Sequence, residues 1–499
     1  MSRLSLLVLT YVLTGSASAQ DASTVRIGSK ASIENIVIGE MLAHLARESG
    51  VTAEHNSALG GTQIVYQALL KGDIDIYPEY TGTLLAEVLR DENIRGEGDL
   101  KAALAKRDLA ISQPLGFNNT YALGLREARA AELNIQKISD LARPEHNDLK
   151  FAFSDEFMRR GDGWPGLASS YKLSHQPKTM DHNLAYRGIV SKQIDVTDLY
   201  STDAEVKYYQ LRVLEDDRGY FPEYNCVLLY RRDFETHDPH ALKSLLRLEG
   251  QIDNTAMSEI NARVKIDQVP EPTAAAAFLT SKLQLKIALP RPPSLLVTTT
   301  RDHLFLVGLS LAAAILVALP LGISSYKWPN LGHVILGVVG IIQTLPSMAV
   351  LVFMIPLLGI GAWPAITALF LYSLLPIVRG TVTGLKEIPG NLKESAIVLG
   401  LPPQACLWRV ELPMASRSIL AGIKTAAVIN VGTATIGALI GAGGYGEPIL
   451  AGLRLNNVPL ILQGAVPAAL LALLVQAGFD ALEPFLVPRG LRIATAGKG

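Results

Sequence analysis

Six short polar segments in the first half of the chain contain, between them, tyrosine, lysine, arginine and threonine, residue types that can bind a small charged solute. A quaternary ammonium donates no hydrogen bond, so tyrosine rings attract it by cation–π and dispersion forces, roughly 0.5–2 kcal/mol per desolvated ring. Lysine or arginine beside a hydroxyl donor suits a carboxylate. The segments are Gly28-Ser29-Lys30, Asp73 to Thr83, Asn118 to Tyr121, Glu156 to Gly163, Asp198 to Asp203 and Phe221 to Tyr224.

These segments resemble the osmoprotectant-binding proteins of ABC importers, the group for glycine betaine, carnitine and choline, along nearly all of residues 24–285. The resemblance implies a two-lobed α/β domain of the type II periplasmic-binding-protein fold, which closes on its ligand by hinge motion. It also implies a set of ligand-binding residues. Four tyrosines would enclose a trimethylammonium head, and three other side chains would bind a carboxylate: Tyr80, Tyr121, Tyr200 and Tyr224, then Lys30, Thr83 and Arg160. Because Arg159 precedes Arg160, a slip of one residue would exchange the two arginines.

The chain shows no pattern typical of a catalytic or metal site, and we expect no cofactor. Its nine histidines form no His-x-x-x-His pair beside a glutamate. Asp216 and Asp217 are adjacent on an extended segment, so they would point to opposite faces. The formal net charge of −1 gives no indication of a nucleic-acid partner. We expect four histidines of this half at the surface: His175, His182, His237 and His240.

Strand-like and helix-like stretches alternate through residues 20–285, as in α/β lobes. The first strand is predicted at Val25 to Lys30 and the first helix at Ile33 to Leu45. A proline-rich run predicts a short stiff linker over residues 286–300. Residues 20–285 are therefore expected to form the substrate-binding domain.

Residues 1–19 have the pattern of a secretory signal peptide. Arg3 precedes an apolar run of about ten residues, and Ala17-Ser18-Ala19 forms an A-x-A cleavage site. The run is shorter than the ~20 residues that span a bilayer. The substrate-binding domain would then lie outside the cytoplasm.

Charged residues are sparse in residues 301–499, which hold 12 Lys+Arg and 7 Asp+Glu. Uncharged stretches there are long enough to cross a bilayer. They predict an all-α transmembrane domain of about five helices: Leu304–Tyr326, two spans within Trp328–Val378 with a turn at 359–364, Thr425–Gly446 and Leu455–Phe479.

Five spans place the two ends of this domain on opposite sides of the membrane. If the secreted half is outside, the loops and tail expected inside carry ten lysines and arginines, whereas the loops expected outside carry only Arg454. This distribution follows the positive-inside rule. The same topology separates Cys226 from Cys406, so no disulfide within one chain is expected.

The long loop expected inside, residues 384–413, contains Glu394-Ser395-Ala396, Gly400 and Leu412-Pro413. The pattern predicts two short helices separated by glycine and prolines, the second ended by Pro413. The spacing resembles the EAA loop of ABC importer permeases, with Ser395 where the family usually has alanine. The resemblance implies that Glu394, Ala396 and Gly400 dock on a separate ATPase subunit. The chain has no Gly-x-x-x-x-Gly-Lys-Ser/Thr motif with which to bind ATP itself.

We therefore interpret the chain as a fused substrate-binding protein and permease of an ABC importer for quaternary-ammonium osmoprotectants such as glycine betaine. It is expected to be a transport subunit and not an enzyme, to dimerise through its permease domains, and to lie in the inner (plasma) membrane with its binding domain in the periplasm. Choline or another betaine such as ergothioneine is the alternative solute. The alternative of another class is a ligand-gated channel or a membrane sensor, but a channel would not need an ATPase dock.

Overall fold

The computed structural model of the protein describes residues 24–90, 92, 94, 96–287 and 294–488. The predicted signal peptide, residues 1–19, lies outside the described residues. The chain divides into two compact units, Met1–Ser57 with Leu69–Leu289 and Ala58–Ala68 with Pro290–Gly499. The first unit holds the α/β domain and the second holds the helical domain.

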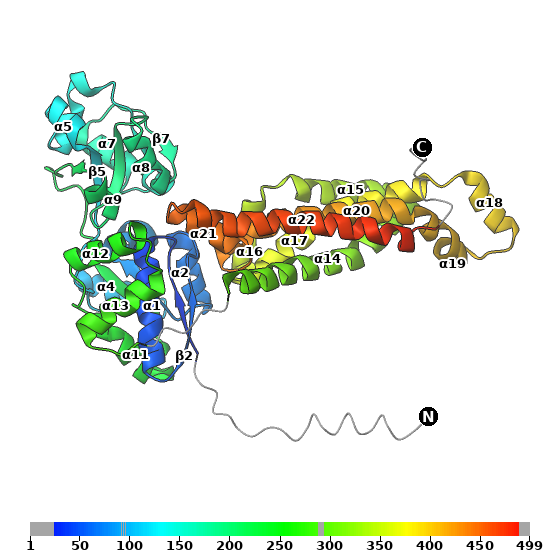
Figure 1. Cartoon of the computed structure of the whole chain (residues 1–499), viewed down its shortest axis with the longest axis horizontal. Coiled ribbons are helices and arrows are strands. Elements are labelled where there is room, and N and C mark those ends of the chain that lie inside the picture. Colours follow the sequence, from blue (N-terminus) through cyan, green and yellow to red (C-terminus); the bar gives the residue numbers. More distant parts are fainter. Residues whose placement is uncertain (1–23, 91, 93, 95, 288–293, 489–499) are drawn as a thin grey trace. The chain divides into compact units, whose positions relative to one another are not determined.

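The α/β domain has two lobes, each built on its own sheet (Figure 1). In the first lobe the strand order is β2-β1-β3-β10-β4, with β1 parallel to β2 and β3 and with β10 antiparallel to β3 and β4. The strands are β1 (Thr24–Gly28), β2 (Thr52–Asn56), β3 (Ile76–Tyr80), β4 (Leu109–Ile111) and β10 (Cys226–Arg231). The helices of residues 33–105 and 234–283 are α1 (Ile33–Glu48), α2 (Thr62–Lys71), α3 (Thr81–Thr83), α4 (Glu97–Ala105), α10 (Phe234–His237), α11 (Pro239–Leu245), α12 (Asn254–Lys265) and α13 (Glu271–Leu283).

The second lobe has a three-stranded sheet of order β8-β5-β9 and a parallel pair, β6 and β7. Its strands are β5 (Tyr121–Arg126), β6 (Ala152–Ser154), β7 (Lys178–Met180), β8 (Val196–Tyr200) and β9 (Leu211–Val213). Its helices are α5 (Glu127–Leu133), α6 (Asp155–Arg159), α7 (Trp164–Tyr171), α8 (His182–Val190) and α9 (Ala204–Tyr208). A core that includes Tyr186, Ile189 and Leu199 holds this lobe together.

Two chain segments connect the lobes, one from β4 to β5 and one from β9 to β10. They pair once, through an antiparallel bridge between Asn118 and Asn225. Each segment has a predicted tyrosine beside this bridge, because Tyr121 begins β5 and Tyr224 immediately precedes Asn225. The hinge therefore brings two motifs together that are far apart in the sequence.

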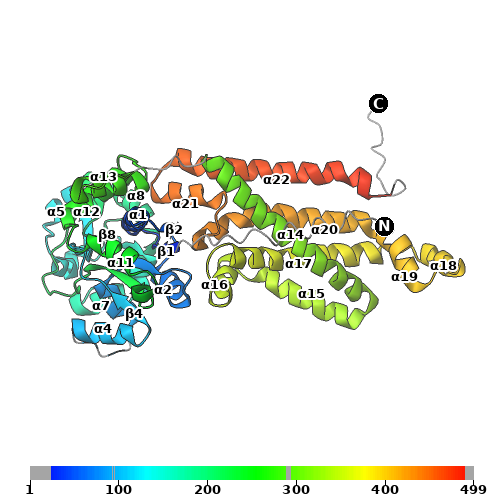
Figure 2. The same ribbon diagram turned by 90° about the horizontal axis from the view of Figure 1, so that it is seen from below.

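The second unit is helical, and its longest helices run alongside one another (Figure 2). They are α14 (Leu295–Lys327), α15 (Pro329–Thr344), α16 (Ser347–Leu358), α17 (Ala362–Lys386), α18 (Gly390–Val398), α19 (Pro403–Cys406), α20 (Leu412–Thr433), α21 (Gly446–Arg454) and α22 (Val458–Leu486). Helices α17 and α20 approach closely because small residues meet there. A β-carbon on Gly422 would lie 2.5 Å from the carbonyl oxygen of Pro376.

Four of these helices are long and apolar enough to cross a membrane, and α15 with α16 makes a fifth if the bent pair counts as one span. The expected fold class, an α/β binding domain followed by about five apolar helices, is confirmed. One difference is the 100° bend between α15 and α16. Pro346 lies in that break, and proline disfavours helical conformation in the residue before it.

Two predicted boundaries were wrong. Helix α14 begins at Leu295, so the last six residues of the predicted linker, 286–300, belong to the first span. Pro413 does not end the second loop helix, because α19, a π-helical turn at Leu407–Glu411 and α20 form one continuous apolar helix, Pro403–Ile440. Pro413 closely follows the π-helical turn, so it lies where the regular α-helical hydrogen bonding of this long helix is already interrupted.

Candidate functional site

Three of the four predicted tyrosines, Tyr121, Tyr200 and Tyr224, form one group, here called the tyrosine cluster. The ring centroid of Tyr121 lies 5.0 Å from that of Tyr200 and 5.6 Å from that of Tyr224. Strand register explains the first pair, because Tyr121 in β5 lies directly opposite Tyr200 in β8. Burial raises the pKa of Tyr121 and of Tyr200 well above the usual value, so both phenols stay neutral.

Two phenylalanines that the sequence analysis did not single out extend this cluster. The ring centroids of Phe157 and Phe221 lie 5.2 Å and 6.3 Å from that of Tyr121. Both residues belong to the quoted polar segments, so their position beside charged and tyrosine residues was an available signal. Aromatic rings on several sides of one another provide the faces that cation–π binding requires.

Tyr80 lies at the end of β3, outside the tyrosine cluster. Its hydroxyl donates to Glu34 at 2.5 Å and accepts from the amide of Asn35. Gly82 connects the two regions instead, because a β-carbon there would lie 2.4 Å from Cδ1 of Tyr224. The backbone that follows Tyr80 therefore packs directly on the ring of Tyr224, an approach that the absence of a side chain permits.

Arg160 is the arginine that faces the tyrosines. Its guanidinium carbon lies 5.5 Å from the ring centroid of Tyr121 and its side chain is 5% exposed. It is held by Asp162 through two hydrogen bonds of 2.8 and 2.6 Å, and by Glu87 at 2.9 Å. Burial lowers the pKa of Arg160, but the hydrogen bonds that Arg160 donates to Asp162 raise this pKa by more. The guanidinium therefore remains charged. Arg159, in contrast, is 79% exposed and pairs with Asp155.

The other two residues predicted to bind a carboxylate lie in the first lobe. Lys30 forms an ion pair of 2.5 Å with the fully buried Glu79. Its ammonium also lies 4.9 Å from the ring centroid of Tyr80. Thr83 is buried in the short helix that follows Tyr80. Lys30 and Arg160 thus each already have a carboxylate partner and a tyrosine ring. A ligand carboxylate would join one of these existing pairs.

Glu34, near the start of α1, is a second residue that the sequence analysis missed. It is 4% exposed and accepts four hydrogen bonds, whose donors are Tyr80, Asn119, Thr202 and Asn261. Burial raises the pKa of Glu34 and these four bonds oppose the rise. A glutamate within a mostly apolar helical pattern was the available signal, since a buried carboxylate needs several donors.

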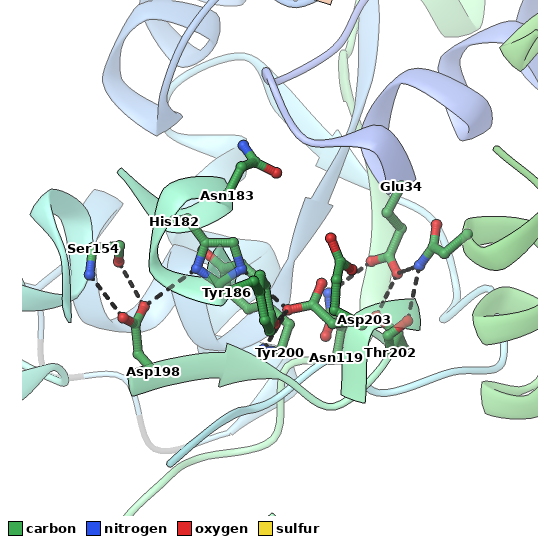
Figure 3. Close-up of polar contacts among 12 residues, drawn as sticks. Glu34, Asn119, Ser154, His182, Asn183, Tyr186, Asp198, Tyr200, Thr202 and Asp203 are labelled. Carbon is green, nitrogen blue, oxygen red and sulfur yellow. Dashed lines mark hydrogen bonds and ion pairs between the residues drawn. The ribbon is translucent and has the colours of Figure 1, made fainter. Parts of the chain in front are cut away.

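The prediction for His175 was wrong, because this residue is buried, and His182 is only partly exposed, at 20%. His175 is 7% exposed and stacks on Phe151. Figure 3 shows His182 between two carboxylates, 3.1 Å from Asp203 and 3.6 Å from Asp198. Burial lowers the pKa of His182, but the two carboxylates outweigh it and raise the pKa to about 10. His237 and His240 are exposed, as expected.

His182 and Asp203 also hold the tyrosine cluster in position. The ring centroid of His182 lies 4.8 Å from that of Tyr200. One Asp203 oxygen accepts hydrogen bonds from the backbone amide of Tyr200 at 2.9 Å and from the hydroxyl of Tyr186 at 2.5 Å. The end of β8, where Tyr200 stands, is therefore fixed from both its backbone and its ring.

Asp216 and Asp217 accept from different donors, and Asp217 lies in a turn rather than on an extended segment. Asp216 accepts from the hydroxyl of Tyr171 and from the backbone amide of Phe221, whereas Asp217 accepts from the amide of Ser139. Within the described parts of the chain, no group of three His, Cys, Asp or Glu residues could hold a metal ion. Cys226 and Cys406 are both free and buried.

The loop with the EAA-type pattern lies at one end of the helical unit, where α18 and α19 extend beyond the long helices (Figures 1 and 2). Glu394 and Gly400 are exposed and Ala396 is buried. Gly400 has a φ of 77°, the left-handed conformation that ends α18. The preceding apolar residues are largely exposed, with Val398 at 87% and Leu399 at 81%. An exposed apolar helix end is a surface that suits a protein partner.

A two-lobed α/β receptor domain followed by apolar helices defines the class of this protein, a solute-binding protein joined to a membrane permease. Residues 23–281 match the family described as "Substrate binding domain of ABC-type glycine betaine transport system". Residues 310–489 match "Binding-protein-dependent transport system inner membrane component". The first match covers more than half of the chain, so the chain belongs to that glycine betaine transport family, with a permease domain of the second kind fused to it.

Individual relatives are similar to one or both halves. The chain is 42% identical over 193 residues to the choline transport system permease protein OpuBB of Bacillus subtilis (strain 168), covering 39% of this chain and 89% of that protein. It is 31% identical over 285 residues to the ergothioneine transport permease/ergothioneine binding protein EgtU of Helicobacter pylori (strain G27). This match covers 55% of this chain and 51% of that protein. Among solved structures, a glycine betaine/carnitine/choline ABC transporter matches with 26% identity and a TM-score of 0.44, over 52% of this chain and 98% of that one.

The interpretation as a fused binding protein and permease of an ABC importer of the glycine betaine type is confirmed. These matches do not favour a ligand-gated channel or a sensor. Permease domains of this kind work with an ATPase subunit that is a separate chain.

Proposed function

We propose that this chain binds and imports a small quaternary-ammonium solute, with glycine betaine as the first candidate. The convergence of Tyr121, Tyr200 and Tyr224 from three separate segments carries the proposal. Neutral, buried phenol rings attract a trimethylammonium head without requiring a hydrogen bond from it. Tyr80 contributes the first-lobe side of this site, next to the Gly82 backbone that packs on Tyr224.

Lys30, Thr83 and Arg160 are proposed to bind the carboxylate of a betaine. Arg160 offers a planar fork of donors, which suits a carboxylate. Both basic side chains are already neutralised by buried carboxylates, Lys30 by Glu79 and Arg160 by Asp162. A ligand carboxylate therefore has to compete for these cations. Choline, which has no carboxylate, avoids that competition and is the second candidate.

Ergothioneine, a betaine with a thiol-bearing imidazole ring, is a third candidate. It is favoured by the similarity to the ergothioneine relative, which covers 55% of this chain. The additional rings of Phe157 and Phe221 beside Tyr121 provide aromatic surface on which a ligand ring can stack.

The transport cycle follows from the order of the parts. The binding domain is proposed to face the periplasm, to close by hinge motion between its lobes, and to deliver the solute to the permease domains. Two copies of the chain are proposed to form a homodimer in the inner membrane, because closed two-fold assemblies are the commonest. The separate ATPase would dock at Glu394, Ala396 and Gly400, where the exposed end of α18 offers an apolar surface.

The test is a calorimetric titration of the purified full chain in detergent with glycine betaine, choline, carnitine and ergothioneine. We expect saturable binding of at least one, with L-valine as a negative control that has the carboxylate but no trimethylammonium group. Uptake of the ligand that binds, measured in cells with the ATPase present and absent, tests transport. Failure of all four to bind would falsify the proposal.

A further inference from the structure

We propose that Glu34 is a positioning residue that sets the relative placement of the four tyrosines across the two lobes. This inference rests on the proposed function, because it concerns the same ligand site. Glu34 would act through the residues it holds and would not contact the solute.

The four donors converge on the two carboxylate oxygens. Oε1 accepts from the Tyr80 hydroxyl at 2.5 Å and from the Asn119 amide at 2.9 Å. Oε2 accepts from the Thr202 hydroxyl at 2.6 Å and from the Asn261 amide at 3.1 Å. A carboxylate has about four acceptor positions, so these bonds leave none for a solute.

Three of the donors are parts of the tyrosine-bearing segments. Tyr80 is itself one of the four tyrosines, Asn119 lies two residues before Tyr121, and Thr202 lies two residues after Tyr200. Since Tyr121 and Tyr200 are opposite one another in the sheet, Glu34 holds both chain ends beside this pair. The fourth tyrosine is linked indirectly, because the Tyr224 backbone amide donates to Asn118, the neighbour of Asn119.

The donors also come from different parts of the binding domain. Tyr80 ends a strand of the first lobe and Asn261 belongs to α12, whereas Thr202 follows β8 of the second lobe and Asn119 lies in a connecting segment. Figure 3 shows Glu34 with Asn119 and Thr202. One carboxylate therefore joins both lobes and the hinge.

The chemistry requires a carboxylate at this position. Tyr80, Asn119, Thr202 and Asn261 present four donors, and glutamine would replace one acceptor oxygen with an N–H₂ group that faces two of them. A buried donor left without an acceptor destabilises this arrangement. Glutamine keeps the volume of the side chain, so its effect reports on the hydrogen bonds and not on packing.

The test compares Glu34→Gln with Glu40→Gln in the purified full chain. Glu40 is a matched control, because it lies in the same helix, is 16% exposed and bonds to His55 at 2.7 Å. Tetramethylammonium and choline are titrated by calorimetry. We expect Glu34→Gln to weaken binding of both by about tenfold, the size expected from losing a charged hydrogen bond, with Glu40→Gln near wild type.

A double-mutant cycle separates positioning from general destabilisation. Tyr80→Phe keeps the ring but removes the hydroxyl that donates to Glu34. The effect of Tyr80→Phe on affinity should therefore be smaller in the Glu34→Gln background than in the wild type. Thr202→Val provides a second route if Glu34→Gln fails to fold. It removes only the donor of the second lobe and should weaken binding several-fold.

The outcomes distinguish the two proposals. A wild-type chain that binds neither tetramethylammonium nor any of glycine betaine, choline, carnitine and ergothioneine overturns the proposed function and this inference with it. A wild-type chain that binds, with Glu34→Gln equal to Glu40→Gln or with additive effects of Glu34→Gln and Tyr80→Phe, overturns the inference alone. Wild-type affinity in Thr202→Val also counts against it.

Discussion

The guanidinium carbon of Arg160 lies 5.5 Å from the ring centroid of Tyr121, while three carboxylates, Asp162, Glu87 and Glu156, hold the same guanidinium. A cation of the protein therefore already stands against one face of a tyrosine proposed to bind a ligand cation. In the proposed function the pair would bring both ends of a zwitterionic solute to one place, because the ring suits its ammonium group and the arginine its carboxylate.

Replacing Tyr121 tests whether the rings act through their faces. Tyr121→Ala should weaken binding of a trimethylammonium ligand by about 1–3 kcal/mol, from lost cation–π attraction and packing together. Tyr121→Phe should cost less, because the ring remains. Calorimetry on the full chain measures both, and equal losses for Phe and Ala at positions 121, 200 and 224 would show that the hydroxyls, and not the ring faces, are what matters.

Glu87→Gln tests whether Arg160 binds the carboxylate of a betaine. Glu87 pairs with Arg160 across the lobes at 2.9 Å, so removing its charge should free part of the guanidinium for a ligand carboxylate. The ratio of glycine betaine affinity to choline affinity should rise several-fold, whereas Lys30→Ala should lower it. If both ligands change equally in both variants, these side chains support the fold only.

Gly82→Ala should displace the ring of Tyr224. The new β-carbon would lie 2.4 Å from Cδ1 of that ring, a distance that forces a shift. We expect weaker ligand binding and a lower melting temperature, measured together on the full chain. Gly98→Ala is the matched control, because a β-carbon there meets nothing within 4 Å and Gly98 lies in a helix. Unchanged affinity in Gly82→Ala would mean that the Tyr224 ring can move without consequence for the site.

The ion pairs of His182 predict a pH dependence of stability. Its pKa is about 10 in the folded chain, above the ordinary value of 6.5. A raised pKa means that protonation favours the folded state. This stabilisation is fully present below pH 6.5 and is lost progressively as the pH rises through about 10. On the acid side, the lowered pKa of Asp203 adds stability that is present above about pH 3.8 and lost as the pH falls.

Thermal unfolding of the full chain, followed from about pH 6 to about pH 10, measures the stability that is lost as His182 deprotonates. The wild-type melting temperature should fall more steeply than that of His182→Gln. His237→Gln, a change at an exposed histidine, should keep the wild-type slope. Parallel slopes for wild type and His182→Gln would contradict a raised pKa at this residue.

The EAA-type loop predicts a separation of binding from transport. Gly400 has a φ of 77°, which a β-branched residue adopts only with strain. Gly400→Val should misplace the exposed end of α18, so that uptake collapses and the ATPase no longer co-purifies, with ligand affinity unchanged. Gly390→Val is the control, because Gly390 also has open space around it but no positive φ. Normal uptake by Gly400→Val would remove the loop as the coupling element.

Much of this protein could be read from its sequence, because the decisive signals are local. Sparse charge and long apolar stretches predicted the membrane helices, and the spacing from Glu394 to Gly400 predicted the exposed loop. The motif segments predicted the α/β receptor and named Tyr121, Tyr200 and Tyr224, which the structure brings together. These features can be recognised from the sequence alone, because the length of an apolar stretch, its periodicity and the spacing of a motif depend only on residues that are close in the chain.

What only the tertiary structure decided concerns contacts between distant segments. Glu34 meets Thr202 and Asn261 across 168 and 227 residues of sequence. His182 is only partly exposed and lies between Asp198 and Asp203. The choice of Arg160 over Arg159 depends on how α6 ends beside Tyr121. No local pattern encodes these pairings, because hydrogen bonds and ion pairs between lobes are set by strand register, by the hinge and by the burial of charges that must then find partners.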